Sequence, residues 1–154
     1  MQVELQVAAN DANVPVGVEW NRWVNATLDT AGVEPDSSAA MTVRLVDCDE
    51  SLKLNTAYRG KSGATNILAF PGPEYVNIQP DTEFGDLVIC LPLVYGEARE
   101  QGKDPLAHIA HLVVHGTLHL LGFDHHEAAD AKRMETLETE IMNRLGFSDP
   151  YEVG

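Results

Sequence analysis

The stretch between Asp104 and Gly122 constrains this chain more than any other part of the sequence. Asp104 is a good N-cap, Pro105 suits the first position of a helix, and Gly122 suits the position that follows one. These signals predict a helix over about 105–121. Four of the six histidines of the chain fall within residues 115–126, at the end of this helix and just beyond it.

Three of these histidines are spaced so that they can converge on one ion. His115 and His119 are four residues apart, so both lie on one face of a helix. Gly122 can adopt the left-handed conformation that lets the chain turn back, and His125 follows three residues later. Three protein nitrogens with an open fourth position are typical of a catalytic zinc rather than a closed structural one. The pattern H-x3-H-x2-G-x2-H therefore predicts one zinc ion per chain, held by His115, His119 and His125.

The residue after the first of these histidines limits the chemistry. The metzincin zinc proteases share the spacing, as H-E-x-x-H-x-x-G-x-x-H, and use the glutamate as their general base. Here that position is Gly116. The metal ligands are present and the peptidase base is missing, which counts against a metallopeptidase but leaves it as one alternative.

Other polar residues near the motif have two interpretations each. His108 and His111 lie on nearly the same helical stripe, one and two turns earlier, and can either support the metal or substrate or pack with a hydrogen bond. Asp124 can orient a ligand imidazole or cap the last helix. His126 is expected to point away from the metal.

The charge distribution sets one segment apart. The formal net charge is −14, which argues against non-specific binding of nucleic acid or anionic membrane through the whole surface. Residues 51–73, however, contain no Asp or Glu and include Lys53, Arg59 and Lys61. This segment is either a solvated loop or a contact surface for an anionic substrate.

Hydrophobic periodicity predicts the fold class. Alternating or continuous apolar runs predict strands at 3–8, 41–47, 66–71 and 85–92. Helical spacing predicts helices at 17–31, 93–101, 105–121 and 127–145, and a short helix or turn at 51–60. The apolar stripe of the last helix is formed by Met134, Leu137, Ile141 and Leu145, and Gly146 ends this helix. The order predicts an α/β (mixed α+β) fold: a single domain over residues 1–154, with a small mixed sheet of about four strands packed with helices and the zinc-motif helix in the C-terminal half.

Three further features predict the compartment. Cys48 and Cys90 form no C-x-x-C pair, so we expect two buried free thiols in a reducing environment. No apolar run approaches the roughly 20 residues that cross a bilayer. The N-terminal MQVELQVAAND lacks the basic and apolar regions of a signal peptide. We therefore expect a cytoplasmic protein with no membrane association.

Four segments together resemble one known family. HLVVHGTLHLLGFDH (111–125) resembles the signature of the YbeY family, the bacterial rRNA maturation factors described as metal-dependent, single-strand-specific endoribonucleases. LNTAYRGKSGATNILAFP (54–71) is similar to a second block of that family, L-N-x-x-Y-R-x-K-x-x-x-T-[DN]-V-L-S-F-P. GDLVIC (85–90) and METLETEIM (134–142) are similar to a third block and to the family's last helix. Departures from the second block occur at Ser62, Ala64 and Ala69, which concern the shape of the loop rather than the metal ligands.

The resemblance implies both a function and a set of site residues. It implies that His115, His119 and His125 bind zinc and that Arg59 is the essential basic residue of the active site. In the acid-free segment, Arg59 and Lys61 are the cations that a phosphodiester substrate would need. The implied substrate is single-stranded RNA, with roles in maturation of the 3′ end of 16S rRNA and in ribosome quality control. The ribosome or ribosomal proteins are the implied partners.

Two nucleophiles fit this interpretation, and both stay open. Zinc lowers the pKa of bound water to about 7, so that hydroxide can attack phosphorus without a glutamate at position 116. Alternatively, the metal activates the RNA 2′-hydroxyl. In either case the metal held by His115 and the guanidinium of Arg59 stabilise the charge that grows on the phosphoryl oxygens. A non-enzymatic alternative is a ribosome-assembly or RNA-binding factor that uses zinc to hold its C-terminal helices.

Overall fold

Helices and strands follow one another in the predicted order. The computed structural model describes residues 1–9, 14–34, 40–60, 63, 65–71, 83–123 and 127–151. The strands are β1 (Gln2–Val7), β2 (Ala40–Val46), β3 (Ile67–Pro71) and β4 (Glu83–Cys90). The helices are α1 (Trp20–Thr30), α2 (Cys48–Arg59), α3 (Leu91–Gln101), α4 (Pro105–Leu120) and α5 (Ala128–Arg144). The predicted α/β class with a four-stranded sheet is confirmed.

The sheet is mixed, as predicted. Its strand order is β1-β2-β4-β3, with β1, β2 and β4 parallel to one another and β3 antiparallel to β4. Parallel neighbours need a crossover connection, and α1 lies between β1 and β2 in the sequence. β3 and β4 are antiparallel, so they need no crossover, and β3 forms one edge of the sheet.

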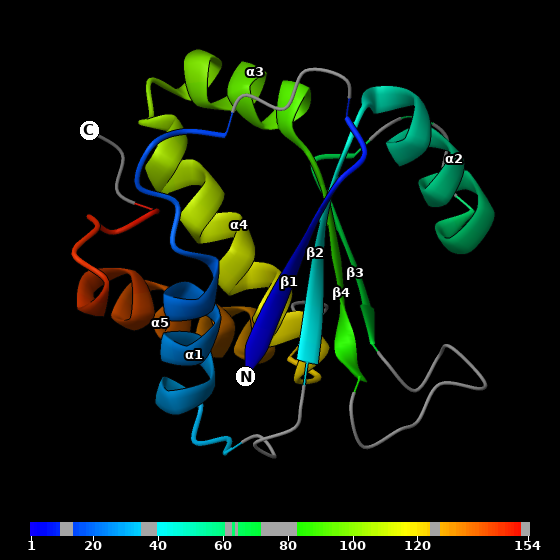
Figure 1. Ribbon diagram of the computed structural model, residues 1–154. Helices are drawn as coiled ribbons and strands as arrows, with labels where there is room; N and C mark the ends of the chain where they lie inside the picture. Colours follow the sequence, from blue (N-terminus) through cyan, green and yellow to red (C-terminus); the bar gives the residue numbers. More distant parts are fainter. Residues whose placement is uncertain are drawn as a thin grey trace.

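Most of the apolar core lies on one face of the sheet. Figure 1 shows α1, α4 and α5 on that side, with α2 on the other. Alternate residues of β2 and β4, among them Val43, Leu87 and Ile89, point into this main core, where they pack against buried residues of the three helices such as Trp23 and Val113. Their intervening neighbours point to the α2 side.

The α2 face holds a much smaller apolar cluster. Its buried members are Val46, Leu68, Phe70, Val88 and Cys90. On the same side, Arg44 of β2 forms a salt bridge with Glu50 of α2, with 2.6 Å between Nε and Oε2. Cys48 and Leu54 of α2 and Leu93 of α3 pack against this smaller cluster.

Several predicted boundaries are wrong. α1 begins at Trp20 rather than at 17, and β4 begins at Glu83 rather than at 85. α2 begins at Cys48 rather than near 51. Asp49 and Glu50 lie in its first turn, where negative charges interact favourably with the positive end of the helix dipole. The strand expected to reach residue 92 ends at Cys90, and α3 begins at Leu91. Pro92 lies in the first turn of α3, where its missing N–H leaves no intrahelical bond unmade.

Both cysteines are free thiols, as predicted, although only Cys90 is buried and Cys48 is half-buried. Their Sγ atoms lie 3.4 Å apart. Burial and the nearby Cys48 raise the pKa of Cys90 to about 11, which keeps it a thiol. Among the described helices, none combines the length and the apolar character needed to span a bilayer.

Candidate metal centre

α4 begins and ends where the sequence predicts. The Oδ1 atom of Asp104 accepts a hydrogen bond from the Leu106 N–H at 3.0 Å. At the other end, Gly122 has φ +94°, a conformation that favours glycine. Its N–H donates to the His119 carbonyl at 2.9 Å, while the Phe123 N–H donates to the Leu118 carbonyl at 3.1 Å, which is the pattern of a Schellman motif. The helix therefore ends at Leu120, and the chain turns away at Gly122, three residues after His119.

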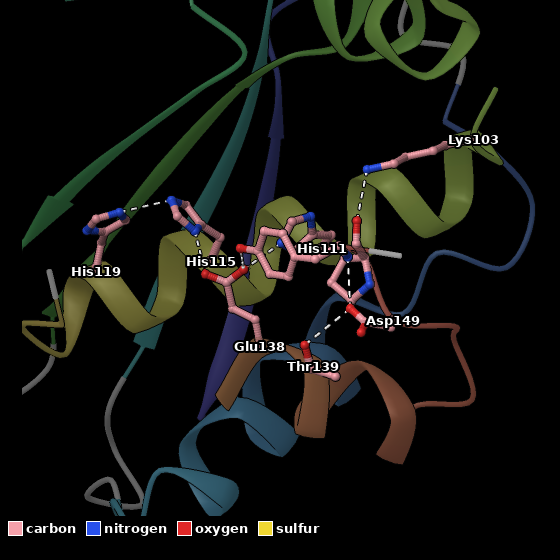
Figure 2. Close-up of polar contacts among 9 residues, drawn as sticks. Lys103, His111, His115, His119, Glu138, Thr139 and Asp149 are labelled. Carbon is pink, nitrogen blue, oxygen red and sulfur yellow. Dashed lines mark hydrogen bonds and ion pairs between the residues drawn. The ribbon is translucent and has the colours of Figure 1, made fainter. Parts of the chain in front are cut away.

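His115 and His119 point toward each other from the last two turns of α4, as Figure 2 shows. Their Nε2 atoms are 3.0 Å apart. Two nitrogens that share a tetrahedral zinc at about 2.0–2.1 Å are roughly 3.3 Å from each other. The imidazole pair therefore fits two ligands of one zinc ion.

A carboxylate from α5 meets the same cluster. Glu138 is fully buried, and its Oε1 accepts a hydrogen bond from His115 Nδ1–H at 2.7 Å. Its Oε2 accepts one from His111 Nε2–H at 2.6 Å. Figure 2 shows Glu138 between these two histidines. The Nε2 of His115 thus faces away from the carboxylate and toward His119.

Residues 149–151, called the C-terminal segment below, contact this cluster. The Tyr151 hydroxyl donates a hydrogen bond to Oε2 of Glu138, and the Tyr151 ring packs edge-on against His111 with 5.4 Å between centroids. Asp149 accepts a hydrogen bond from Thr139 of α5, and Lys103 Nζ donates to the Pro150 carbonyl. The segment is therefore anchored both on α5 and beside the start of α4.

The protonation states of these groups follow from their contacts. Burial raises the pKa of Glu138, but the hydrogen bonds from His111, His115 and Tyr151 outweigh it and lower the pKa to about 2. Burial, together with the nearby Glu138, raises the pKa of Tyr151 above its usual value. At neutral pH, Glu138 is a charged acceptor and Tyr151 a neutral donor.

Several predicted site residues lie outside what the structure describes. His125 and Lys61 are not among the described residues, nor are Asp124 and His126. Arg59 is the last residue of α2, but its side chain is not described. Within the described ranges, no group of three or more His, Cys, Asp or Glu side chains is placed to hold a metal. The roles of His125, Arg59 and Lys61 stay predictions.

A match to a family model identifies the family of this chain. The family model described as "Endoribonuclease YbeY" matches residues 6–146, which include all of α4 and α5. The chain belongs to the YbeY family.

Curated relatives match it along almost their whole length. A protein of Nitrosococcus oceani named Endoribonuclease YbeY is 47% identical over 152 residues, covering 97% of this chain and 96% of that relative. One of Coxiella burnetii with the same name is 44% identical, covering 99% of each. The solution structure of TM1509 from Thermotoga maritima matches with a TM-score of 0.52 and 22% identity, covering 97% of this chain and 99% of that one. That likeness supports the fold alone.

Sequence reasoning missed two residues of this YbeY-family cluster, Glu138 and Tyr151. Glu138 comes four residues after Met134 and three before Ile141, so it lies on the buried stripe of α5. The predicted apolar stripe of α5 is confirmed: Met134, Ile141 and Leu145 are buried in the main core, and half-buried Leu137 packs against it. A glutamate at a core position was the available signal, because Glu is almost never fully buried unless it is paired.

Gly116 faces the sheet in this YbeY-family chain. A Cβ atom there would lie 2.7 Å from Leu87 Cδ2 and 2.9 Å from Ile67 Cδ1. A glutamate at this position would therefore enter the packed contact between α4 and the sheet. The missing peptidase base is thus explained by close packing.

The two undecided histidines of α4 have different surroundings. Buried His108 donates from Nε2 to Oε1 of Glu97 in α3 at 3.1 Å, and Glu97 also accepts a hydrogen bond from Asn66. His108 therefore has the packed, hydrogen-bonded role. His111 instead shares Glu138 with His115 and belongs to the candidate centre.

Proposed function

We propose that this chain is a zinc-dependent, single-strand-specific endoribonuclease that acts in rRNA maturation at the 3′ end of 16S rRNA and in ribosome quality control. The observation that carries the proposal is the pair of converging imidazoles of His115 and His119. It occurs in a chain whose curated relatives, matched over nearly their full length, are named endoribonucleases.

The ligands of the proposed zinc ion are His115, His119 and His125. When bound, zinc supplies Lewis-acid chemistry: it lowers the pKa of a water ligand to about 7 and polarises a phosphoryl oxygen. The chain directs the Nε2 of His115 toward the metal position, because Nδ1 of the same ring is held by Glu138. His115 is therefore both a ligand and a catalytic residue in this proposal.

Arg59 is proposed to bind and orient the phosphate. A guanidinium offers two parallel donors to two phosphate oxygens and keeps its charge at every relevant pH. Its neighbour Lys61 would add a second cation for the substrate. Support comes from the segment around them, because residues 51–73 contain no Asp or Glu. The nucleophile is either water or the RNA 2′-hydroxyl.

Gly63 and Thr65, which follow Arg59 in the sequence, are hydrogen-bonded to side chains of α2. Buried Ser51 accepts a hydrogen bond from the Thr65 N–H at 2.9 Å and donates one to the Thr65 carbonyl at 2.7 Å. Asn55 donates to the Gly63 carbonyl at 3.0 Å. These contacts attach Gly63 and Thr65 to α2, the helix that ends at Arg59, and this favours a defined phosphate site over a solvated loop.

A non-catalytic ribosome-assembly factor with a zinc-stabilised C-terminal half is the second candidate. The observation in its favour is that Glu138 ties together α4, α5 and the C-terminal segment, so a metal beside it would reinforce the fold. The metallopeptidase alternative loses support from the packing of Gly116. Proposed partners are rRNA and the ribosome or ribosomal proteins, in the cytoplasm.

The deciding experiment is incubation of the zinc-loaded protein with matched single-stranded and duplex RNA, followed by identification of the product ends. Cleavage restricted to the single strand supports the proposal. A 2′,3′-cyclic phosphate product indicates attack by the 2′-hydroxyl, whereas a 5′-phosphate and a 3′-hydroxyl indicate attack by water. Zinc-loaded protein that binds RNA without cutting it would support the assembly factor.

A further inference from the structure

We propose that Glu138 is a positioning residue for the metal centre: it holds His115 in the Nδ1–H tautomer and turns its Nε2 toward His119. The inference rests on the proposed function for the identity of the metal centre. The contact between Glu138 and His115 is observed independently of that function. The contact joins residues 23 positions apart in the sequence, on two different helices.

Both oxygens of Glu138 are occupied by donors, which fixes the carboxylate. Oε1 accepts from His115, and Oε2 accepts from both His111 and Tyr151. The donors come from α4 and from the C-terminal segment, while the carboxylate itself comes from α5. Rotation of the carboxylate would break hydrogen bonds to all of them, so the direction offered to His115 Nδ1 is set by three segments.

The consequence for His115 follows from the chemistry of imidazole. A neutral ring carries one N–H and one lone pair, and the hydrogen bond made by one nitrogen decides the state of the other. A carboxylate can only accept, so the nitrogen that faces Glu138 must be the N–H. Nε2 then carries the lone pair, and it lies 3.0 Å from the Nε2 of His119.

A purely structural interpretation explains less. A leucine or methionine at position 138 would suit a helix stripe that otherwise buries Met134, Ile141 and Met142. A buried carboxylate is costly unless its hydrogen bonds are complete. Here the completed set includes the ring nitrogen opposite the one that points at the candidate metal position. Partners of this kind typically change metal affinity by about 10–100-fold when they are removed.

The test measures the tautomer of His115 directly. Metal-free protein with ¹⁵N-labelled histidine is studied by two-bond ¹⁵N–¹H correlation NMR at about pH 8, where histidine is normally neutral. We expect His115 as the Nδ1–H form in the wild-type protein. This measurement needs no variant, and finding His115 as the Nε2–H form would overturn the inference.

Glu138→Gln gives the second measurement. The amide offers a single acceptor atom to three donors, so His115 should lose part of its Nδ1–H population, and zinc affinity measured by competition with a chelator dye should fall about 10–100-fold. Glu140→Gln is the matched control, because it removes the same charge from an exposed position two residues further along α5. Equal zinc affinity of the two variants would contradict the inference.

Tyr151→Phe serves if Glu138→Gln fails to fold. It keeps the ring on His111 and removes one of the three donors to Glu138. We expect a loss of zinc affinity of less than about tenfold, and an unchanged affinity would count against the inference. A structural carboxylate would lower the melting midpoint of metal-free Glu138→Gln without changing the His115 tautomer.

Failure of this inference differs from failure of the proposed function. Wild-type protein that binds zinc with His115 in the Nδ1–H form but cuts no RNA overturns the endoribonuclease proposal and supports the role of Glu138. If the wild-type protein cuts RNA but Glu138→Gln binds zinc as tightly as Glu140→Gln, the endoribonuclease proposal is supported and the role of Glu138 is overturned.

Discussion

On one face of the sheet, α4 packs with α1 and α5 in the main core. There, buried Glu138 accepts a hydrogen bond from His115 of α4. On the other face, α2 covers a cluster of five buried side chains and ends at Arg59. The first face fixes side chains through core packing and buried hydrogen bonds. The second relies on hydrogen bonds between the side chains of Ser51 and Asn55 and the backbone of Thr65 and Gly63.

This difference matches the demands of the two proposed tasks. Metal ligands must converge within a few tenths of an ångström, so they need a rigid, densely packed support. A cation that binds an RNA phosphate must stay accessible to a large, flexible substrate, and binding segments of this kind commonly lie on loops positioned by a rigid scaffold. The α4 face should therefore govern metal content, and the α2 face should govern cleavage without changing metal content.

The largest effect is expected from the ligands of the α4 face. His115→Ala, His119→Ala and His125→Ala should each lose most bound zinc and all measurable RNA cleavage, because two remaining imidazoles bind zinc weakly. Metal content by elemental analysis and cleavage rate test this. Chelator should lower the melting midpoint of the wild type, because zinc bound only to the folded chain adds to its stability, and it should leave that of His115→Ala unchanged.

His108→Gln is the control for this prediction, because it removes a buried imidazole from the same helix that contacts Glu97 instead. It should keep its zinc. Full zinc occupancy in His125→Ala would overturn the three-ligand prediction.

The next effect concerns the α2 face. Arg59→Ala should reduce cleavage by about 10²–10³-fold, the cost of removing one well-placed donor to developing charge, while zinc content and melting midpoint stay as in the wild type. Arg59→Lys should recover little, because an ammonium lacks the planar fork. Lys53→Ala removes a cation from an exposed position of the same helix and should cleave normally.

Near-normal cleavage by Arg59→Ala would remove Arg59 from the mechanism. Loss of zinc together with cleavage would show that the two faces are not independent.

The two apolar clusters give a matched pair of core truncations. Leu87→Ala opens the main core beneath Gly116, and Leu68→Ala opens the smaller cluster. Each should lower the free energy of unfolding by about 2–5 kcal/mol, with Leu87→Ala at the upper end because its site is more completely enclosed. Only Leu87→Ala should also weaken zinc binding. Denaturant unfolding of the metal-free proteins and zinc titration provide the test, and equal effects on zinc would contradict the division between faces.

The smallest effect is expected at the contact between α4 and the sheet. Alanine is favoured over glycine inside a helix by about 1 kcal/mol, whereas overpacking costs about 1–3 kcal/mol. A Cβ atom added at Gly96 in α3 would meet open space, whereas one added at Gly116 would not. Gly96→Ala should therefore raise the free energy of unfolding, measured by denaturant titration. The free energy of unfolding of Gly116→Ala should be about 1–3 kcal/mol lower than that of Gly96→Ala. Equal values would mean that Leu87 and Ile67 move aside at no cost.

Local signals in the sequence predicted much of this protein. The bounds of α4 and the turn after it follow from Asp104, Pro105 and Gly122, because capping and left-handed backbone depend on residues close in the chain. The convergence of His115 and His119 follows from helix geometry alone. The order of strands and helices followed from periodicity, and the errors fell at boundaries such as Cys48, where periodicity is weak.

Contacts between distant elements were decided only in the tertiary structure. Glu138 is 23 residues from His115, and its role depends on how α5 crosses α4, which no local pattern encodes. The same holds for Gly116, whose lack of a side chain became meaningful only when Leu87 and Ile67 were found against it. The sequence by itself determined which residues could bind a metal, because helix periodicity is set by the backbone. Only the packing of helices on the sheet decided which carboxylate supports them, because that depends on contacts far apart in the chain.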